Sequence, residues 1–178
     1  MTMRKKNNRR LKVPLSVSSP ALLVGGSDHA FRGLIANLHA MASQLIELRA
    51  RMARQLGITG PQFGLFLAVA HFEGEDGVNV STIARKLRVT PAFVTTEAGK
   101  LIRKRILAKR DSKVDRRGVL LSVTPSGHRV LAAFAPRLQT INEEVFGSID
   151  ARAFRTLTRM VESLVAGAER ALSLDGKK

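Results

Sequence analysis

The stretch VNVSTIARKLRVTPAFVTTEAGKLIRKRIL, residues 78–107, decides the fold. Ser81 is expected to cap a brief helix over residues 82–87, and a second helix is expected over 91–104. Residues 88–89 leave room only for a tight turn between the two helices. Two short helices joined in this way, the second rich in Thr and in Lys or Arg, are typical of a helix-turn-helix.

A β-hairpin is predicted directly after this pair of helices. Residues 106–110 and 119–123 form two β-like runs, with alternating apolar residues in the second run, and residues 78–80 are a further short strand candidate. The segment DSKVDRRG at 111–118 between the two runs is polar and basic. A hairpin in this place is the wing of a winged helix-turn-helix.

Long amphipathic helices are predicted on both sides of this core. Apolar residues recur with helical spacing after Asp28 as far as Gly57, and again in two helices that begin at Thr124-Pro125 and at Asp150. The predicted fold class is mainly α (α+β). The predicted units are a disordered basic arm over 1–27, a dimerisation helix over 28–56, a winged helix-turn-helix DNA-binding region over 57–124, and C-terminal dimerisation helices over 125–174.

The positive charge of the chain is concentrated in two places. Of the net charge of +16, residues 1–27 contribute six basic residues and no acidic residue, and residues 81–118 contribute twelve basic and three acidic residues. A charge needed only for solubility would be spread evenly along the chain. Its concentration here predicts a polyanionic partner, of which nucleic acid is the commonest.

Several other classes of protein are disfavoured by the composition. The absence of cysteine excludes a disulfide scaffold, a thiolate metal site and a thiol redox switch. The four histidines are too scattered to predict a metal site, and there is neither a phosphate-binding glycine loop nor a nucleophile with a base at motif spacing. No apolar run approaches the roughly 20 residues of a membrane-spanning helix. We therefore expect neither an enzyme nor a cofactor.

The motif at residues 111–127, DSKVDRRGVLLSVTPSG, resembles the wing and its exit in the MarR family of bacterial transcriptional regulators. In that family an Asp and an Arg two residues apart precede a strand that ends in Leu/Val-Thr-Pro-x-Gly, and Asp115 and Arg117 occupy the two positions here. GITGPQFGLFLAV at 57–69 resembles the second helix of the family, and the resemblance extends over about residues 30–172.

The resemblance implies a homodimer that binds double-stranded DNA at a pseudo-palindromic operator, usually as a repressor. It also implies a cytoplasmic, nucleoid-associated protein of a bacterium or archaeon. Family members often release DNA when a small, frequently aromatic or anionic effector binds between the dimerisation and DNA-binding parts, in a cleft lined by the first, second and fifth helices. This chain departs from the family at Arg105, where a Gly is usual, and at Thr96, where an Arg is common. Glu97 adds a negative charge beside Thr96.

The candidate DNA-binding residues lie on the second helix of the pair and on the hairpin tip. Threonine hydroxyls would reach bases or phosphates, lysines and Arg103 would bind phosphates, and Arg116 and Arg117 suit the minor groove. By resemblance, Arg117 reads the groove and Asp115 fixes its geometry. Phe93 would either meet a thymine methyl group or pack under the wing. The full set is Ser81, Thr90, Ala92, Phe93, Thr95, Thr96, Lys100, Arg103, Lys104, Lys113, Asp115, Arg116 and Arg117.

The terminal helices carry more apolar surface than one chain can cover, which predicts a homodimer. The candidate interface residues are Phe31, Leu34, Ile35, Leu38, Phe154, Leu157, Val161 and Leu164. Two alternatives stay open. The helices could instead form an intramolecular bundle, and the protein could be a general nucleic-acid binder, of RNA or of DNA as an architectural protein.

Overall fold

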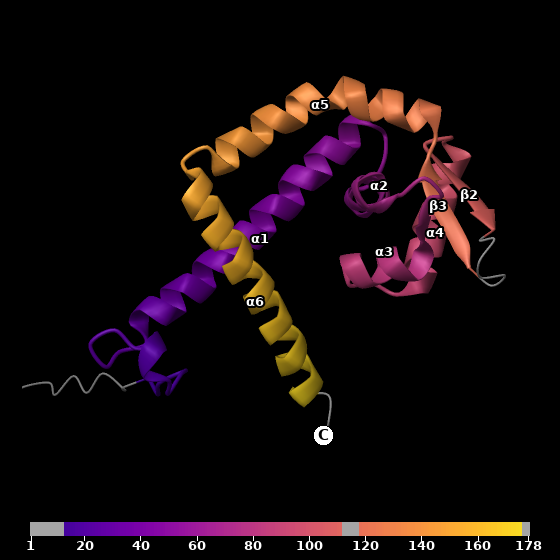
Figure 1. The fold of residues 1–178 in the computed structure, drawn as a ribbon. Coiled ribbons are helices and arrows are strands. Elements are labelled where there is room, and N and C mark those ends of the chain that lie inside the picture. The colour runs from indigo at the N-terminus through magenta and orange to yellow at the C-terminus, as the bar shows by residue number, and fades with distance from the viewer. Residues whose placement is uncertain (1–12, 112–117, 176–178) are drawn as a thin grey trace, which may run out of the picture.

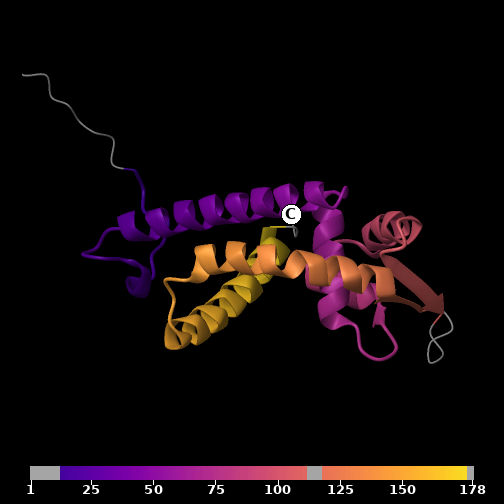
Figure 2. The same cartoon turned by 90° about the horizontal axis from the view of Figure 1, so that it is seen from above.

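The computed structural model describes residues 13–111 and 118–175. Its elements are η1 (Pro20–Leu22), α1 (His29–Gln55), α2 (Gly60–Phe72), β1 (Val78–Asn79), α3 (Val80–Leu87), α4 (Pro91–Arg103), β2 (Leu107–Asp111), β3 (Val119–Val123), α5 (Pro125–Phe146) and α6 (Ala151–Asp175). The helices α2, α3 and α4 gather with the sheet at one end, and α1, α5 and α6 extend away from it (Figures 1 and 2). The predicted mainly helical, winged helix-turn-helix fold is confirmed.

Three helices begin at a threonine that caps them, because a Thr hydroxyl can accept a backbone N–H that has no partner within the helix. The hydroxyl groups of Thr59, Thr90 and Thr124 each accept the backbone N–H three residues later, at 3.3, 3.2 and 2.9 Å. Each threonine is followed by a proline in the first turn of its helix, where the missing N–H costs no hydrogen bond.

The start of α3 differs from the prediction that Ser81 caps it. Asn79 is the N-cap, and its Oδ1 accepts the backbone N–H of Ser81 at 2.8 Å and the hydroxyl of Ser81 at 2.5 Å. The amide oxygen of Asn79 takes the capping role because strand β1 ends at this residue and places it directly before the first turn.

The sheet has three antiparallel strands in the order β1-β3-β2. Val78 pairs with Leu121, and Lys109 of the neighbouring strand pairs with the same residue from the other side. Leu121 and Val123 are buried, whereas Val119 at the outer end of the hairpin is exposed.

The hydrophobic core lies between α2, α3, α4 and the sheet. Its largest fully buried side chains include Phe63, Phe66 and Leu101. Helix α4 buries one stripe against this core, formed by Val94, Ala98 and Leu101. Helix α5 joins this core through Phe134, whose ring meets the ring of Phe63 edge to face at a centroid distance of 5.7 Å.

The turn from α4 into β2 is built on Arg105, which has a φ of 58°. The residue that replaces the usual glycine, Arg105, therefore has a left-handed backbone conformation. The hydroxyl of Thr124 donates to the carbonyl oxygen of Arg105 at 2.6 Å, and the backbone N–H of Thr124 donates to the carbonyl oxygen of Ile106 at 3.1 Å. The Thr-Pro-x-Gly motif thus closes the turn that joins α4 to the wing.

We expect Arg105→Gly to raise the free energy of unfolding by about 1 kcal/mol, because glycine adopts a positive φ without the steric cost of a Cβ. Denaturant unfolding measures the change. Arg105→Ala is the matched control, since it removes the same charge and keeps the Cβ. An equal gain from both variants would show that loss of the charge, and not relief of the backbone, stabilises the protein.

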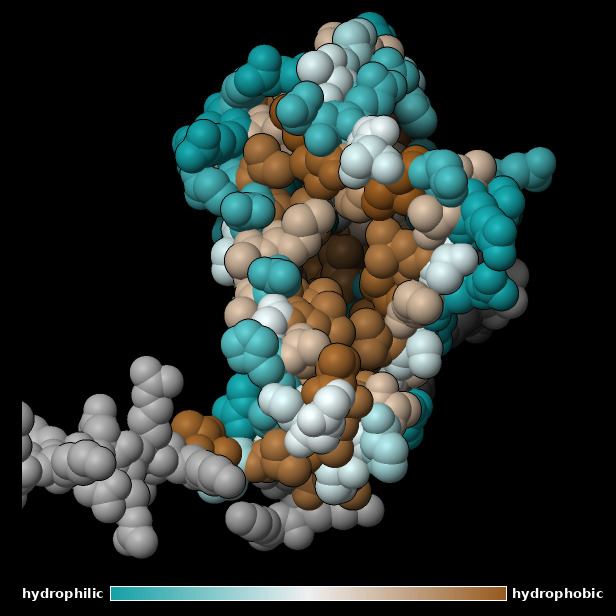
Figure 3. All heavy atoms as spheres, turned by 90° about the vertical axis from the view of Figure 1, so that its left-hand side faces the viewer, coloured by the Kyte–Doolittle hydropathy of each residue, from teal (hydrophilic) through white to brown (hydrophobic). Residues whose placement is uncertain are grey.

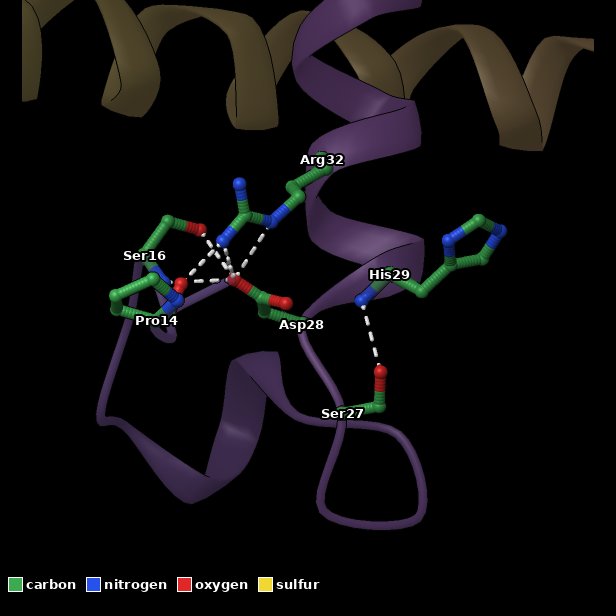
Figure 4. A network of polar contacts seen from close by, with 6 residues as sticks. All are labelled: Pro14, Ser16, Ser27, Asp28, His29 and Arg32. Carbon is green, nitrogen blue, oxygen red and sulfur yellow. Dashed lines mark hydrogen bonds and ion pairs between the residues drawn. The ribbon is translucent and has the colours of Figure 1, made fainter. Parts of the chain in front are cut away.

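Residues 13–27, which belong to the predicted disordered basic arm over 1–27, have a described path that leads into α1. The Asp28 carboxylate accepts the backbone N–H of Ser16 at 2.7 Å, the hydroxyl of Ser16 at 2.6 Å and Nε of Arg32 at 2.9 Å (Figure 4). Arg32 also donates to the carbonyl oxygen of Pro14. These hydrogen bonds, from Arg32 above all, hold the pKa of Asp28 well below its usual range. Residues 1–12 lie outside the described residues.

Candidate nucleic-acid interface

Helix α4 presents a polar face that is opposite to its buried stripe. Thr95, Thr96 and Arg103 are exposed, and so are Ala92 and the capping residue Thr90 at the start of the helix. Phe93 stands beside them with 36% of its surface exposed. It does not line the hollow that separates α4 from the sheet, which favours its placement on the outer face over packing under the wing.

A hollow of about 640 Å³ separates α4 from the sheet. Ala98, Ile102 and Leu121 contribute apolar surface to it. Its polar and cationic lining comes from α4, from the start of α3 and from the wing, through Asn79, Ser81, Thr95, Arg103 and Lys109. No carboxylate lines the hollow among the described residues. Hydroxyl groups and two cations around an apolar floor suit an anion that enters from outside.

Asn79 and Lys109 are members of this site that the sequence reasoning missed. A usable signal existed for Lys109, because side chains alternate along a strand and residue 109 lies on the same face as Leu107. Leu107 is buried in the core. The face of β2 that carries Leu107 and Lys109 is therefore expected to lie toward α4.

Several cations of this region are already neutralised by carboxylates. Arg110 binds Asp76 at 2.5 Å, Arg88 forms an ion pair with Glu169 of α6, and Lys100 binds Glu97 at 2.5 Å. Between described residues, no ion pair involves Arg103, Lys104 or Lys109. These three cations therefore make the larger contribution to the positive potential around α4.

Glu97 does not lie on the exposed face of α4 beside Thr96. It is only 8% exposed, and its two carboxylate oxygens bind Lys100 and the side-chain amide of Gln62. The hydrogen bond from Lys100 contributes most to holding the pKa of Glu97 below its usual range, and Gln62 assists, while burial acts in the opposite direction. The carboxylate is thus ionised and satisfied inside the protein.

Four predicted site residues of the wing tip, Lys113, Asp115, Arg116 and Arg117, lie outside the described residues. The strands that lead to the tip are described: β2 ends at Asp111 and β3 begins at Val119. These two strands point outward beside α4 (Figure 1).

The long helices carry a second, apolar surface. Of the predicted interface residues only Phe31 is half-buried, and the other seven are exposed: Leu34, Ile35, Leu38, Phe154, Leu157, Val161 and Leu164. No residue of α6 is buried within its described length. Seen from the side of the α5–α6 corner, the molecule is hollowed and largely hydrophobic (Figure 3). An intramolecular bundle would have covered these side chains, so that alternative does not describe this chain.

Among residues 13–111 and 118–175, no cluster of three or more His, Asp or Glu side chains is placed to hold a metal ion. Within these ranges, no helix combines the length and the apolar character that crossing a membrane requires.

The fold and this surface together define a winged helix-turn-helix protein with long flanking helices. Residues 56–118 match the family model described as MarR family, which confirms the predicted resemblance. A search among curated proteins finds no match.

Solved structures share the fold over most of the chain. A MarR protein from Peptoclostridium difficile has 18% identity and a TM-score of 0.65, covering 84% of this chain and 94% of its own. MepR from S. aureus, solved with DNA, has 19% identity and a TM-score of 0.59, with coverage of 74% and 96%. The M. tuberculosis regulator MosR, also solved with DNA, has 20% identity and a TM-score of 0.60, with coverage of 77% and 96%.

Proposed function

We propose that this protein is a sequence-specific, double-stranded DNA-binding transcriptional regulator that acts as a homodimer. The observation that carries the proposal is the exposed polar face of α4, bordered by a hollow that holds Arg103 and Lys109 and no carboxylate among its described lining. The DNA complexes of MepR and MosR, which share this fold, support it.

In this proposal α4 enters the major groove with its N-terminal half against the bases. Ala92, Phe93, Thr95 and Thr96 meet base edges and thymine methyl groups. Ser81, Thr90 and Lys104 bind the backbone and set the register. The wing tip enters the adjacent minor groove with Arg116 and Arg117, where Asp115 orients Arg117 and Lys113 binds a phosphate.

The hollow beside α4 has a place in this arrangement. When a helix occupies the major groove and the adjacent hairpin occupies the minor groove, the phosphodiester strand that divides the two grooves must pass between them. In this chain the space between α4 and the sheet is the hollow that contains Arg103 and Lys109. We assign these two cations to the phosphates of that strand.

Dimerisation supplies the second half-site. One recognition helix makes few base contacts, whereas two helices about 34–36 Å apart read one pseudo-palindrome. The uncovered apolar residues of α1 and α6 are the surface through which we expect two copies to pair. Occupation of a promoter by such a dimer would repress transcription. Release by a small aromatic or anionic effector, in a cleft of α1, α2 and α5, rests on the family resemblance.

Selection of bound sequences from random duplex DNA tests the proposal, and an inverted repeat is the expected result. Salt titration on the selected site and on random duplex then separates a specific regulator from a general nucleic-acid binder. The specific regulator keeps its preference as salt weakens the phosphate contacts, while the general binder loses affinity for both duplexes together. Selection of no common sequence would favour the general binder.

Arg103→Ala combined with Lys109→Ala is expected to lower DNA affinity about 10- to 100-fold and to reduce the salt slope by about 2, one unit for each lost phosphate contact. The slope is measured as log affinity against log salt concentration. Arg137→Ala on α5, an exposed arginine away from α4, is the control and should leave the slope unchanged. An unchanged slope in the double variant would contradict the assignment of the hollow.

A further inference from the structure

We propose that Glu97 is a positioning residue for DNA recognition, which fixes α4 through Gln62 and holds Lys100 away from the DNA phosphates. This inference rests on the proposed function. Its basis is a buried polar chain that crosses from the start of α2 to the recognition helix, and that none of the contacts assigned to DNA uses.

This series of hydrogen bonds begins at Thr59, between the end of α1 and the start of α2. The side-chain oxygen Oε1 of Gln62 accepts the backbone N–H of Thr59 at 3.1 Å, and its amide nitrogen Nε2 donates to Oε2 of Glu97 at 2.9 Å. The second oxygen, Oε1 of Glu97, accepts from Nζ of Lys100 at 2.5 Å. Gln62 and Glu97 are only 5% and 8% exposed, so water does not compete strongly for these hydrogen bonds.

These hydrogen bonds restrict the orientation of α4 more closely than its apolar packing does. Val94, Ala98 and Leu101 bury one stripe of α4, but apolar contacts have no preferred direction and tolerate a small rotation or shift. A hydrogen bond weakens steeply when its angle changes. The Gln62–Glu97 bond therefore sets the rotation of α4 relative to the segment that follows α1.

The ion pair with Glu97 keeps Lys100 from the phosphate contact that the sequence predicted for it. Residues three apart on a helix are neighbours on its surface, so the ammonium group of Lys100 reaches the carboxylate of Glu97 without strain. The pair carries no net charge. A cation already neutralised by a buried carboxylate releases no counterion from DNA and adds nothing to the salt dependence of binding.

Salt titration of four proteins on one selected duplex tests this inference: wild type, Lys100→Met, Glu97→Gln, and the double variant. We expect Lys100→Met alone to leave the salt slope unchanged. Glu97→Gln frees Lys100 for a phosphate and should steepen the slope by about 1, and the double variant should restore the wild-type slope. A slope that falls by about 1 in Lys100→Met alone would overturn the inference, because Lys100 would then lie on a phosphate.

The link to α2 is tested by comparing Glu97→Gln with Glu97→Leu. Both variants lose the same charge, but only glutamine keeps a side-chain oxygen that can accept from Gln62. We expect Glu97→Gln to keep the wild-type ratio of specific to non-specific affinity and Glu97→Leu to lower it more than tenfold. Equal ratios in the two variants would overturn the positioning role.

If Glu97→Leu does not fold, Gln62→Met is the alternative variant, because it removes the other partner of the Gln62–Glu97 hydrogen bond. It leaves both Glu97 and Lys100 in place, and we expect it to lower the specificity ratio with an unchanged salt slope. Failure of the proposed function is recognised separately, because wild-type protein would then select no DNA sequence. Selective wild-type binding with a wild-type slope in Glu97→Gln would overturn only the inference.

Discussion

Replacing both Leu157 and Leu164 with glutamate is expected to convert the proposed homodimer into a monomer and to weaken binding to a palindromic site by at least about 100-fold. The two leucines are seven residues apart on α6 and therefore share one face of the helix. Both are exposed in the single chain. Burying two carboxylates in an apolar interface costs several kcal/mol, and loss of the paired subunit removes the roughly 10²- to 10⁴-fold gain of two linked half-sites.

Sedimentation and DNA titration measure the two effects on the same protein. Arg155→Glu is the matched control, since it changes the net charge by the same two units from a position almost opposite the leucines on the helix. It should remain dimeric and keep its affinity. A dimeric Leu157/Leu164 variant would place the subunit contact elsewhere, whereas a monomer with full affinity would refute the need for pairing.

Gly127→Ala is expected to lower the free energy of unfolding by about 2–4 kcal/mol. A Cβ at this position would lie 2.3 Å from the carbonyl oxygen of Ile106 and 2.7 Å from Cγ1 of Val123. The carbonyl group cannot move aside cheaply, because it accepts the backbone N–H and the hydroxyl of Thr124. The clash therefore falls on the turn that joins α4 to the wing.

Denaturant unfolding again measures this change. Gly99→Ala is the control within the same region: its Cβ would meet only the end of the Arg103 side chain, at 3.8 Å. Because Gly99 lies inside a helix, alanine there should raise stability by up to about 1 kcal/mol. Stability equal to that of the wild type in Gly127→Ala would show that the turn can open to admit a methyl group.

The elements that depend on local chemistry were predictable from the sequence. Thr59, Thr90 and Thr124 indicate helix starts because each precedes a proline, and the spacing of Val94, Ala98 and Leu101 indicates the buried stripe. The predicted cap of α3, Ser81, was two residues away from the observed cap, Asn79. Both an asparagine amide and a serine hydroxyl suit that role, so the sequence did not distinguish them.

Contacts between distant residues were not predictable in this way. Glu97 lies three residues after Val94 and four before Leu101, so helical spacing places it beside the buried stripe, but an acidic residue is seldom buried without a partner. Its partner Gln62 is 35 residues away. Likewise Asp28 binds Ser16 across twelve residues, and nothing in the composition of the arm signals that contact. Lys109 differs, because the alternation of side chains along β2 places it on the face of the buried Leu107 and could have signalled its position.

The hydrogen bonds between Ser16 and Asp28 hold the segment that follows Val13 at the N-terminus of α1. This end of α1 is the opposite one from α2 and α4 (Figure 2), and six basic residues precede Val13 in the sequence. A helix of 27 residues is about 40 Å long, several times the Debye length of about 8 Å at physiological salt. The field of a charge held at that end of α1 would decay before it reaches α4. Charge there and charge on α4 would therefore act on a polyanion as independent centres.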